Sequence, residues 1–553
     1  MKKIFLIFIA SSVVLASCKK ELDVKNPNEP VVSAAANEQG IISLAQGGIY
    51  VNGFKDLKYG DGVFGLYWSG AMGFHEMLGD VIGAEAANSF ENQIGCPDKV
   101  TLDNGTVVLN PNNPNKWYTF HRTVNQNDQQ GSNFIFYEWA YSYNTVAAAN
   151  KVMAILPEVE FSGNAATKTA TIKAWCHFWK AYAYGRIGSI FYAGIINDDA
   201  HDQTNGNYVT KEAMIAESNK QYDLAIADLN AATSTADYNA IIGKLIPSFC
   251  QKGKGLPPTT AMWIRNINTL KARNLLVNKT VASMVAGDWS ALLTLTNAGL
   301  LAGDYVFTGR TTATGDFLPS SGATVASRVQ SSAPGGGGFK LSERWVQDFK
   351  TGDQRYTNNV KSGATWIGNS DRGNAFNTRY TLYNGGNGVA GTYVYANTAS
   401  GGFELPLTGT YEENALIKAE ALINSSQIDQ GLAQIDAVRT YMGAGLAPVS
   451  GTGLSLAQAQ EELRKERRIA LAFRGLSFYD ARRLVFPGRT KPICEPFSTG
   501  GGRTGCTVIA TNATVSTNAT IDYGYLDYWD VPDNELAYNP PAAGSAPIKN
   551  PKQ

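Results

Sequence analysis

Few residues of this 553-residue chain have the types and spacing that catalysis or metal binding requires. The four histidines are His75, His121, His177 and His201. Glu76 follows His75, but the second histidine of a zinc-protease helix, four residues after the first, is missing. No G-x-S-x-G nucleophile elbow, P-loop or dinucleotide-binding glycine pattern is present. We therefore predict that the chain is not an enzyme and uses no metal or cofactor.

Two groups of acidic residues remain as candidates for chemistry. Residues 197–199 (Asn-Asp-Asp) and Asp202 gather oxygen ligands without the spacing of an EF-hand. We interpret them as a solvated turn, with a calcium site as the alternative. Glu412 and Glu413 are adjacent, so their side chains diverge on a helix and cannot flank one glycosidic bond. Acids that meet from separate loops would still allow a glycoside hydrolase, which stays open as a less favoured alternative.

The N-terminus carries signals for export and lipid attachment. Two lysines precede the apolar run 4–10, and small residues lead to Cys18 in the sequence Leu-Ala-Ser-Cys. The run is too short to span a bilayer, which takes about 20 apolar residues. We predict that residues 1–17 are a signal peptide, that the Cys18 thiol is acylated, and that the polar segment 18–36 is a tether. The alternative is an ordinary signal peptide with a chance cysteine.

Charge and cysteine content limit the partners and the covalent links. Basic and acidic residues number 47 each, so no basic field favours nucleic acid as a partner. Besides Cys18 there are five cysteines, and the odd number leaves at least one free or paired outside the chain. Cys494 and Cys506 flank a glycine-rich loop that a disulfide could close in an exported protein. Cys176 lies among aromatic residues in a helical pattern, which predicts a buried thiol.

Apolar residues recur at helical spacing over most of the chain. They predict a helix that starts near residue 260 and helices at 38–50, 64–78, 132–157, 168–185, 210–232, 288–300, 410–423 and 428–438. Consecutive amphipathic helices form αα-hairpins, and their Ala-rich packing positions resemble tetratricopeptide repeats (TPR) without the strict consensus. The predicted fold class is therefore mostly α, a TPR-like array of helical pairs.

The composition changes between residues 303 and 402. This stretch is rich in Gly, Thr, Ser, Asn and Tyr and has no sustained helical period. Short β-prone pieces at 379–383 and 392–395 are bounded by Gly and Asn, as in small hairpins. We predict an irregular, Gly- and aromatic-rich insertion with short β-structure. The chain then divides into a signal peptide, a tether, an N-terminal TPR-like part, a loop-rich ligand-binding region and a C-terminal part, at 1–17, 18–36, 37–302, 303–402 and 403–553.

The stretch 455–484 combines a helical apolar face with many charges. Ser455 and Gln458 have capping-box spacing, and Gly475 interrupts the helical period. We interpret the charges as an ion-paired helix face that covers a core, because a chain without net charge does not favour nucleic acid. The cluster comprises Arg464, Lys465, Arg467, Arg468, Arg474, Arg482 and Arg483 around Glu461, Glu462, Glu466 and Asp480.

Segments 466–475 (ERRIALAFRG) and 480–483 (DARR) resemble the C-terminal signature of the SusD/RagB family. The tail 531–540 resembles the closing segment of that family. Together with the N-terminal cysteine signal and the helical pairs, these motifs occur in the expected order, so the resemblance covers nearly the whole chain. The signature departs from the family at three positions, which hold Ala470, Arg474 and Ser477 in place of Glu, Glu and Arg.

The resemblance implies a nutrient-capturing lipoprotein in the outer membrane of a member of the Bacteroidetes, exposed at the cell surface and anchored in lipid through Cys18. It implies that the protein binds an oligosaccharide without cleaving it and delivers it to a TonB-dependent, SusC-like transporter. Some members of the family take peptides, so a peptide is the alternative ligand.

Two Gly- and Asn-rich excursions, at 83–118 and 303–402, are predicted to carry the binding loops. Aromatic rings pack against the C–H faces of sugars, while amide and guanidinium groups bind hydroxyls. The candidates are the rings of Trp117, Tyr118, Trp366 and Tyr383, with Asn115 and Arg372 as polar partners. None of them is carried over from the family, whose sugar-contacting residues do not align by motif in these loops.

Overall fold

The structure is a computed structural model of the whole chain. It describes residues 35–54, 67–68, 72–84, 97–109, 117–132, 134–200, 204–312, 318–319, 339–367, 378–484, 503–509, 514–522 and 526–551. The predicted signal peptide, Cys18 and nearly all of the predicted tether therefore lie outside the described residues.

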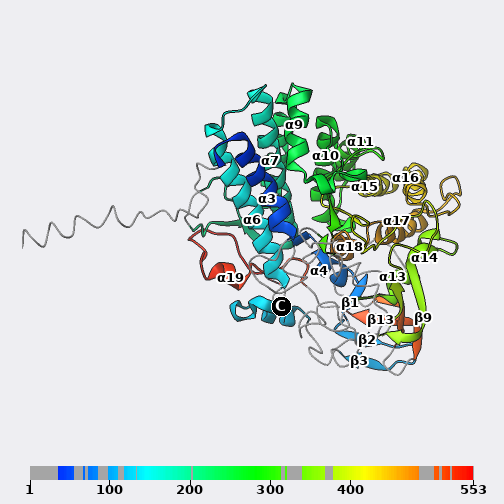
Figure 1. The fold of residues 1–553 in the computed structure, drawn as a ribbon. Coiled ribbons are helices and arrows are strands. Elements are labelled where there is room, and N and C mark those ends of the chain that lie inside the picture. The colour runs from blue at the N-terminus through cyan, green and yellow to red at the C-terminus, as the bar shows by residue number, and fades with distance from the viewer. Residues whose placement is uncertain are drawn as a thin grey trace, which may run out of the picture.

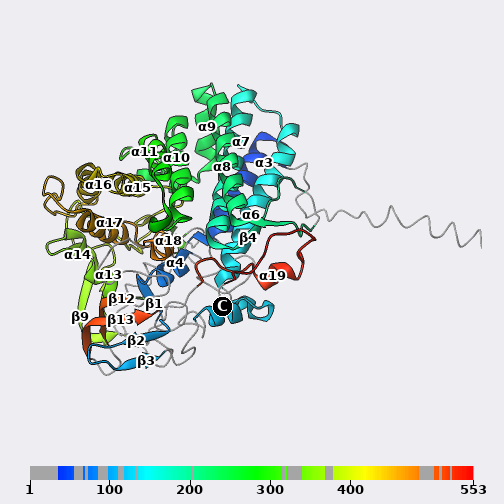
Figure 2. The ribbon, with the colours of Figure 1, turned by 180° about the vertical axis from the view of Figure 1, so that it is seen from behind.

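Paired helices make up most of the molecule (Figures 1 and 2). Consecutive helices pack on each other, as α6 does on α7 and α15 on α16, which confirms the predicted mostly α, TPR-like array. The helices are α3 (Glu38–Phe54), α6 (Phe134–Ile155), α7 (Ala165–Ile190), α8 (Lys211–Ala231), α9 (Thr235–Leu245), α10 (Thr260–Val277), α11 (Ala286–Asn297), α15 (Tyr411–Asn424), α16 (Ile428–Tyr441), α17 (Leu456–Ala470) and α18 (Ser477–Arg483).

Side-chain caps fix where several of these helices begin. The Thr210, Thr259 and Thr410 side chains each accept a hydrogen bond from a backbone N–H in the first turn of α8, α10 and α15. The predicted capping box of α17 is confirmed, because Ser455 Oγ accepts from the Gln458 N–H while Gln458 Oε1 accepts from the Ser455 N–H. Helix α9, which was not predicted, begins after a Ser234 cap.

Short helices and strands form the remainder, and in Figure 1 strands β1, β2, β3, β9 and β13 gather at one end of the array. The short helices are α4 (Met72–Leu78), α5 (Trp117–Val124), α13 (Glu343–Gln347), α14 (Gln354–Asn359) and α19 (Asp533–Leu536). The strands pair as β12 (Arg503–Ile509)–β13 (Val515–Asp522)–β2 (Lys99–Thr101)–β3 (Val107–Leu109), β11 (Glu404–Pro406)–β6 (Thr308–Thr312)–β7 (Leu318–Pro319), β10 (Thr378–Leu382)–β9 (Val360–Ile367), β1 (Ile82–Ala84)–β8 (Phe339–Leu341) and β4 (Ala193–Ile195)–β5 (Tyr208–Thr210).

Strand β10 confirms the β-structure predicted at 379–383, whereas the strand predicted at 392–395 is wrong. In that segment the Tyr393 N–H donates to the Met442 carbonyl and the Tyr395 N–H to Asn359 Oδ1. Its backbone donors therefore bond to a helix end and to a side chain instead of to a neighbouring strand.

The sheets cross the predicted internal boundaries of the chain. Strand β1 pairs with β8, β2 with β13, and β11 with β6. The predicted boundaries at residues 302 and 402 stay a prediction. The strand pairs join residues on either side of each boundary by backbone hydrogen bonds.

Aromatic side chains fill the core around α7. The rings of Trp175, Phe178 and Trp179 surround Phe307, and the Trp263 and Phe307 centroids lie 5.1 Å apart. Seven of the ten tryptophans are among the largest fully buried side chains, so most of the indole content serves packing. Cys176 is a free, buried thiol on α7, as predicted, and burial raises its pKa.

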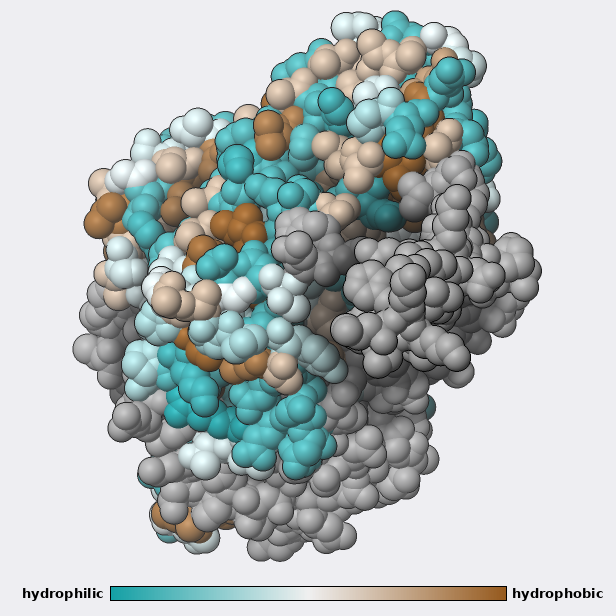
Figure 3. All heavy atoms as spheres, turned by 90° about the vertical axis from the view of Figure 1, so that its left-hand side faces the viewer, coloured by the Kyte–Doolittle hydropathy of each residue, from teal (hydrophilic) through white to brown (hydrophobic). Residues whose placement is uncertain are grey.

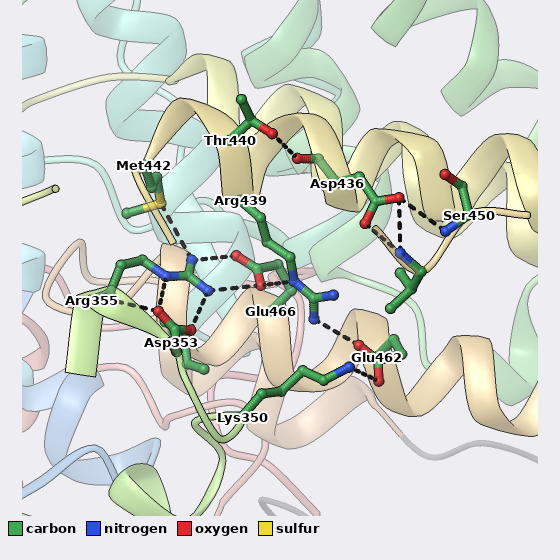
Figure 4. A network of polar contacts seen from close by, with 12 residues as sticks. Lys350, Asp353, Arg355, Asp436, Arg439, Thr440, Met442, Ser450, Glu462 and Glu466 are labelled. Atoms are coloured by element: carbon green, nitrogen blue, oxygen red, sulfur yellow. Dashed lines mark hydrogen bonds and ion pairs between the residues drawn. The ribbon is translucent and has the colours of Figure 1, made fainter. Parts of the chain in front are cut away.

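Helix α17 is held by buried ion pairs (Figure 4). Glu466 lies between two guanidinium groups, with Oε1 2.5 Å from Arg355 and Oε2 2.8 Å from Arg439. Arg355 also pairs with Asp353 at 2.8 Å, and Arg439 with Glu462 at 2.7 Å. The predicted ion pairing of this helix is confirmed. The structure adds that its arginines are buried, where Arg464 and Arg468 pair with Asp348 and Arg467 pairs with Asp480 of α18.

Covalent and membrane features are only partly within the described residues. Cys506 is disulfide-bonded, and its partner lies outside the described residues, so the pairing with Cys494 stays a prediction. Among the helices that the structure describes, none is both long and apolar enough to cross a membrane.

Candidate ligand-binding pocket

A pocket of about 160 Å³ lies where the helical pair α15–α16 meets the sheet β11–β6. Its walls come from the segment 253–255, the turn after α11 and the loop before β11. The first turn of α15, the last residue of α16 and the turn after α17 complete them. The lining residues are Lys254, Leu300, Leu301, Asp304, Val306, Thr308, Tyr393, Val394, Phe403, Glu404, Pro406, Thr410, Tyr411, Glu412, Tyr441 and Arg474.

Four aromatic rings line this pocket, namely those of Tyr393, Phe403, Tyr411 and Tyr441. The Tyr411 and Tyr441 rings meet edge to face, with centroids 5.0 Å apart, and Tyr441 is 37% exposed. Burial raises the pKa of both hydroxyls, so they stay protonated and can donate hydrogen bonds at neutral pH. The rings thus offer apolar faces and hydroxyl donors at one opening.

Each carboxylate of the pocket is paired with an arginine. The pairs are Asp304 with Arg265 at 2.6 Å, Glu404 with Arg310 at 2.9 Å and Glu412 with Arg474 at 2.9 Å. Burial by itself would raise the pKa of Glu412, but Arg474 outweighs burial and holds that pKa below its usual value. Glycoside hydrolysis requires a protonated carboxyl beside the scissile bond, and Glu412 is held ionised.

The two cations that line the pocket have donor capacity left. Lys254 Nζ donates to the Ala302 carbonyl and lies 5.6 Å from the Tyr441 ring centroid. Among the described residues, no carboxylate lies within ion-pair distance of this ammonium. Arg474 donates to Glu412 and to Thr410 Oγ1, each at 2.9 Å, while its buried Nε–H makes no hydrogen bond in the described part of the chain.

A strained turn after α17 places Arg474 in the pocket. Phe473 has a φ of 63° and Gly475 a φ of 66°, so the chain turns back sharply around Arg474. A left-handed conformation costs a residue such as Phe473 roughly 1–2 kcal/mol. Its ring packs edge to face on Trp345 at 5.7 Å and Tyr395 at 5.8 Å, and this packing offsets the strain. Strained backbone held in this way is typical of functional sites.

No protein-family model and no curated protein sequence matches this chain. Solved structures do match it. A SusD-like carbohydrate-binding protein from Bacteroides vulgatus gives a TM-score of 0.54 at 12% identity, covering 94% of this chain and 98% of that chain. A SusD superfamily protein from the same organism gives 0.48 at 16% identity, covering 80% and 87%. Surface glycan-binding protein A from Bacteroides uniformis gives 0.49 at 15% identity, covering 80% and 87%.

The chain has a SusD-like fold. The first of these matches extends over nearly all of both chains, so the fold expected from the sequence motifs is confirmed. At this level of identity the likeness concerns the architecture alone.

Of the predicted sugar-binding residues, Tyr383 has a side chain that the structure of this SusD-like chain describes, and it does not line the pocket. Trp117 and Tyr118 are the first residues of α5, and Trp366 belongs to β9, while Asn115 and Arg372 lie outside the described residues. These candidates therefore stay a prediction. The pocket residues come from five separate segments, and local sequence patterns carried no sign that these segments meet.

Tyr383 and Trp366 are carried at opposite ends of the β9–β10 pair. Val360 pairs with Leu382 and Ile367 with Thr378, so the two positions are separated by most of the length of the pair, roughly 17 Å at 3.4 Å a residue. Tyr383 is half-buried, and its backbone N–H donates to the Asn359 carbonyl at 2.8 Å. The structure thus does not bring these two candidates together.

Three of the acidic residues singled out in the sequence, Glu412, Glu413 and Asp198, have cationic partners. Glu412 pairs with Arg474, whereas Glu413 makes two 2.6 Å bonds to Arg273, so the predicted divergence of the two glutamates is confirmed. In the turn at 197–199, an Asp198 carboxylate oxygen lies 3.5 Å from Lys180 Nζ. Asp202 lies outside the described residues, and the described ones contain no cluster of His, Cys, Asp and Glu that could hold a metal ion.

Proposed function

We propose that this protein is a surface lipoprotein that binds oligosaccharides and delivers them to a TonB-dependent transporter in the outer membrane. The observation that carries the proposal is the pocket lined by Tyr393, Phe403, Tyr411 and Tyr441 on a SusD-like fold. A protein with this fold from Bacteroides vulgatus is described as carbohydrate-binding. The N-terminal sequence, with Cys18 after a short apolar run, supports anchoring in the membrane.

The size and chemistry of the pocket suit one sugar ring of a longer chain. Its volume of about 160 Å³ is below the range of about 300–1,000 Å³ found for pockets that enclose a whole small molecule. An oligosaccharide would therefore place one residue inside and leave the others at the opening. Tyrosine rings pack on C–H faces, while tyrosine hydroxyls and Lys254 bind sugar hydroxyls.

Binding without cleavage is supported by the ion pairs of the pocket. Each of its three carboxylates faces an arginine, and a glycosidase needs one carboxyl that holds a proton and a second that attacks or activates water. Turnover of labelled oligosaccharides by the purified protein would contradict this part of the proposal.

Calorimetry with matched panels of oligosaccharides and peptides tests the ligand class. We expect at least one oligosaccharide to bind and the Tyr411→Ala and Tyr441→Ala variants to weaken its binding about fivefold or more, because truncating a central aromatic contact costs over about 1 kcal/mol. Tyr538→Ala is the matched control, since Tyr538 is 76% exposed and does not line the pocket. Binding of peptides alone, or equal losses in all three variants, would contradict the proposal.

The transporter partner is tested separately. We expect the acylated, full-length protein, cross-linked in intact outer membranes, to be recovered with a TonB-dependent receptor. Recovery without such a receptor would contradict delivery and leave oligosaccharide binding to be judged by the calorimetry.

A further inference from the structure

The charges around the pocket do not cancel. Among the described residues, four cationic groups face three carboxylates, and these are Lys254, Arg265, Arg310 and Arg474 against Asp304, Glu404 and Glu412. Since each carboxylate already has an arginine within 2.9 Å, the remaining cation is Lys254. An ammonium group without a counter-ion at the mouth of a pocket makes the binding of an anion there more favourable.

The donors of Lys254 are only partly used. An ammonium has three N–H donors, and in the described part of the chain one of them bonds to the Ala302 carbonyl. The Tyr441 ring, 5.6 Å from Nζ, holds the ammonium at the mouth of the pocket by a cation–π contact. Two N–H groups therefore remain for a ligand.

Arg474, whose charge is paired with Glu412, adds a hydrogen-bond donor deeper in the same pocket. Its side chain is 5% exposed, and its Cζ lies 5.5 Å from the Tyr393 ring centroid. The bonds to Glu412 and Thr410 fix its position, and its Nε–H has no acceptor in the described residues. A buried donor without an acceptor costs free energy, so a ligand oxygen that satisfied it would be favoured.

We propose that the pocket selects sugars that carry a carboxylate, that is, oligosaccharides ending in a uronic acid, with the carboxylate bound by the ammonium of Lys254 and one of its oxygens accepting the Arg474 Nε–H. This inference rests on the proposed oligosaccharide-binding function. Aromatic rings hold the sugar ring, while Lys254 distinguishes the acidic sugar from its neutral counterpart. Glu404 and Glu412 do not repel the ligand carboxylate strongly, because their charges are neutralised by Arg310 and Arg474.

The test compares uronic-acid oligosaccharides with the same oligosaccharides after chemical reduction of their carboxyl groups to alcohols. We expect the reduced forms to bind the intact protein about tenfold or more weakly, because a hydrogen bond to a charged group is worth more than a neutral one. Raising the salt concentration should weaken the binding of the acidic oligosaccharides and leave that of the reduced ones unchanged.

Variants of Lys254 locate the selectivity. Lys254 is only partly buried, so Lys254→Gln should fold; we expect it to bind acidic and reduced forms equally, and Lys254→Arg to restore the preference. Lys151→Gln is the matched control, because Lys151 is exposed on α6, away from the pocket.

The outcomes separate the two proposals. Equal binding of acidic and reduced sugars by the wild-type protein, or a preference unchanged in Lys254→Gln, would overturn the carboxylate inference while oligosaccharide binding stands. Binding of carboxylate-terminated peptides without any oligosaccharide would overturn both.

Discussion

Glu76 shows how burial sets the behaviour of a single residue. It is 1% exposed on α4, and its Oε1 accepts the Gly475 N–H at 2.9 Å, directly behind the turn that presents Arg474. Burial raises its pKa from 4.5 to about 7, although the N–H groups of Phe473 and Gly475 favour the charged form. The free energy of unfolding therefore depends on the protonation of one carboxyl beneath the pocket.

A Glu76→Gln substitution tests this dependence. The folded state keeps the Glu76 proton up to about pH 7, whereas the unfolded chain releases it near 4.5. Its stabilising contribution is thus complete below pH 4.5 and is lost as the pH rises through 7. Glutamine does not ionise and keeps an acceptor for Gly475, so the variant should gain about 2–3 kcal/mol on wild type between about pH 5 and 8.

Urea unfolding of the variant and of the wild-type protein at about pH 5 and about pH 8 measures that gain. Glu160→Gln is the control. Glu160 is an exposed glutamate, so this variant should have the same free energy of unfolding as the wild-type protein at both pH values. An equal difference between Glu76→Gln and wild type at both pH values would show that Glu76 does not titrate in this range.

At the scale of the element, α17 acts as a charged helix inside the protein. Its carboxylates and guanidinium groups contact α16 and the segment 343–359 rather than water (Figure 4). Buried ion pairs contribute little net stability compared with apolar packing, but removal of one partner leaves an uncompensated charge. We therefore expect this helix to be sensitive to the loss of any one carboxylate.

Glu466→Gln tests the helix directly. Glu466 is shared by Arg355 and Arg439. The neutral amide of glutamine would remove the negative charge that compensates both buried guanidinium groups. We expect a loss of about 3–5 kcal/mol in the free energy of unfolding, measured by denaturant titration. Lys465→Gln on the same helix breaks only the 3.7 Å contact with Glu461 at a partly exposed position, which should cost below about 1 kcal/mol. Comparable losses in the two variants would contradict the buried-charge argument.

At the scale of the whole molecule, the array supports the pocket, and we propose that the sequence before it supplies a lipid anchor. Figures 1 and 2 both show α15 and α16 beside α10 and α11, and the pocket lies next to them, where α15 and α16 meet the sheet β11–β6. On the face shown in Figure 3, hydrophobic residues of the described part form small, separate groups among hydrophilic ones. The described residues on that face therefore form no broad apolar patch.

The anchor is tested by Cys18→Ser. In the proposed anchor the Cys18 thiol is the attachment point for the acyl chains, and each buried methylene would stabilise membrane binding by about 0.8 kcal/mol. We expect the variant to leave the membrane fraction and to incorporate no labelled fatty acid. Cys176→Ala, which removes a buried free thiol, should stay in the membrane fraction. A Cys18→Ser protein that still sediments with membranes would contradict lipid anchoring.

The sequence by itself determined the helical pairs, the caps at Thr410 and Ser455, and the ion pairing of 455–484. The helices and their caps depend on side chains three or four residues apart, so a local pattern is sufficient to encode them. The charge pattern of 455–484 predicted ion pairing, but the partners Asp348, Arg355 and Arg439 are brought to it by the fold. Only the tertiary structure decided that Lys254, Tyr393, Tyr411, Tyr441 and Arg474 share one pocket. Their contacts join segments up to 220 positions apart in the numbering, as Lys254 and Arg474 are. Such contacts follow from the packing of whole helices and sheets, which no short-range periodicity specifies.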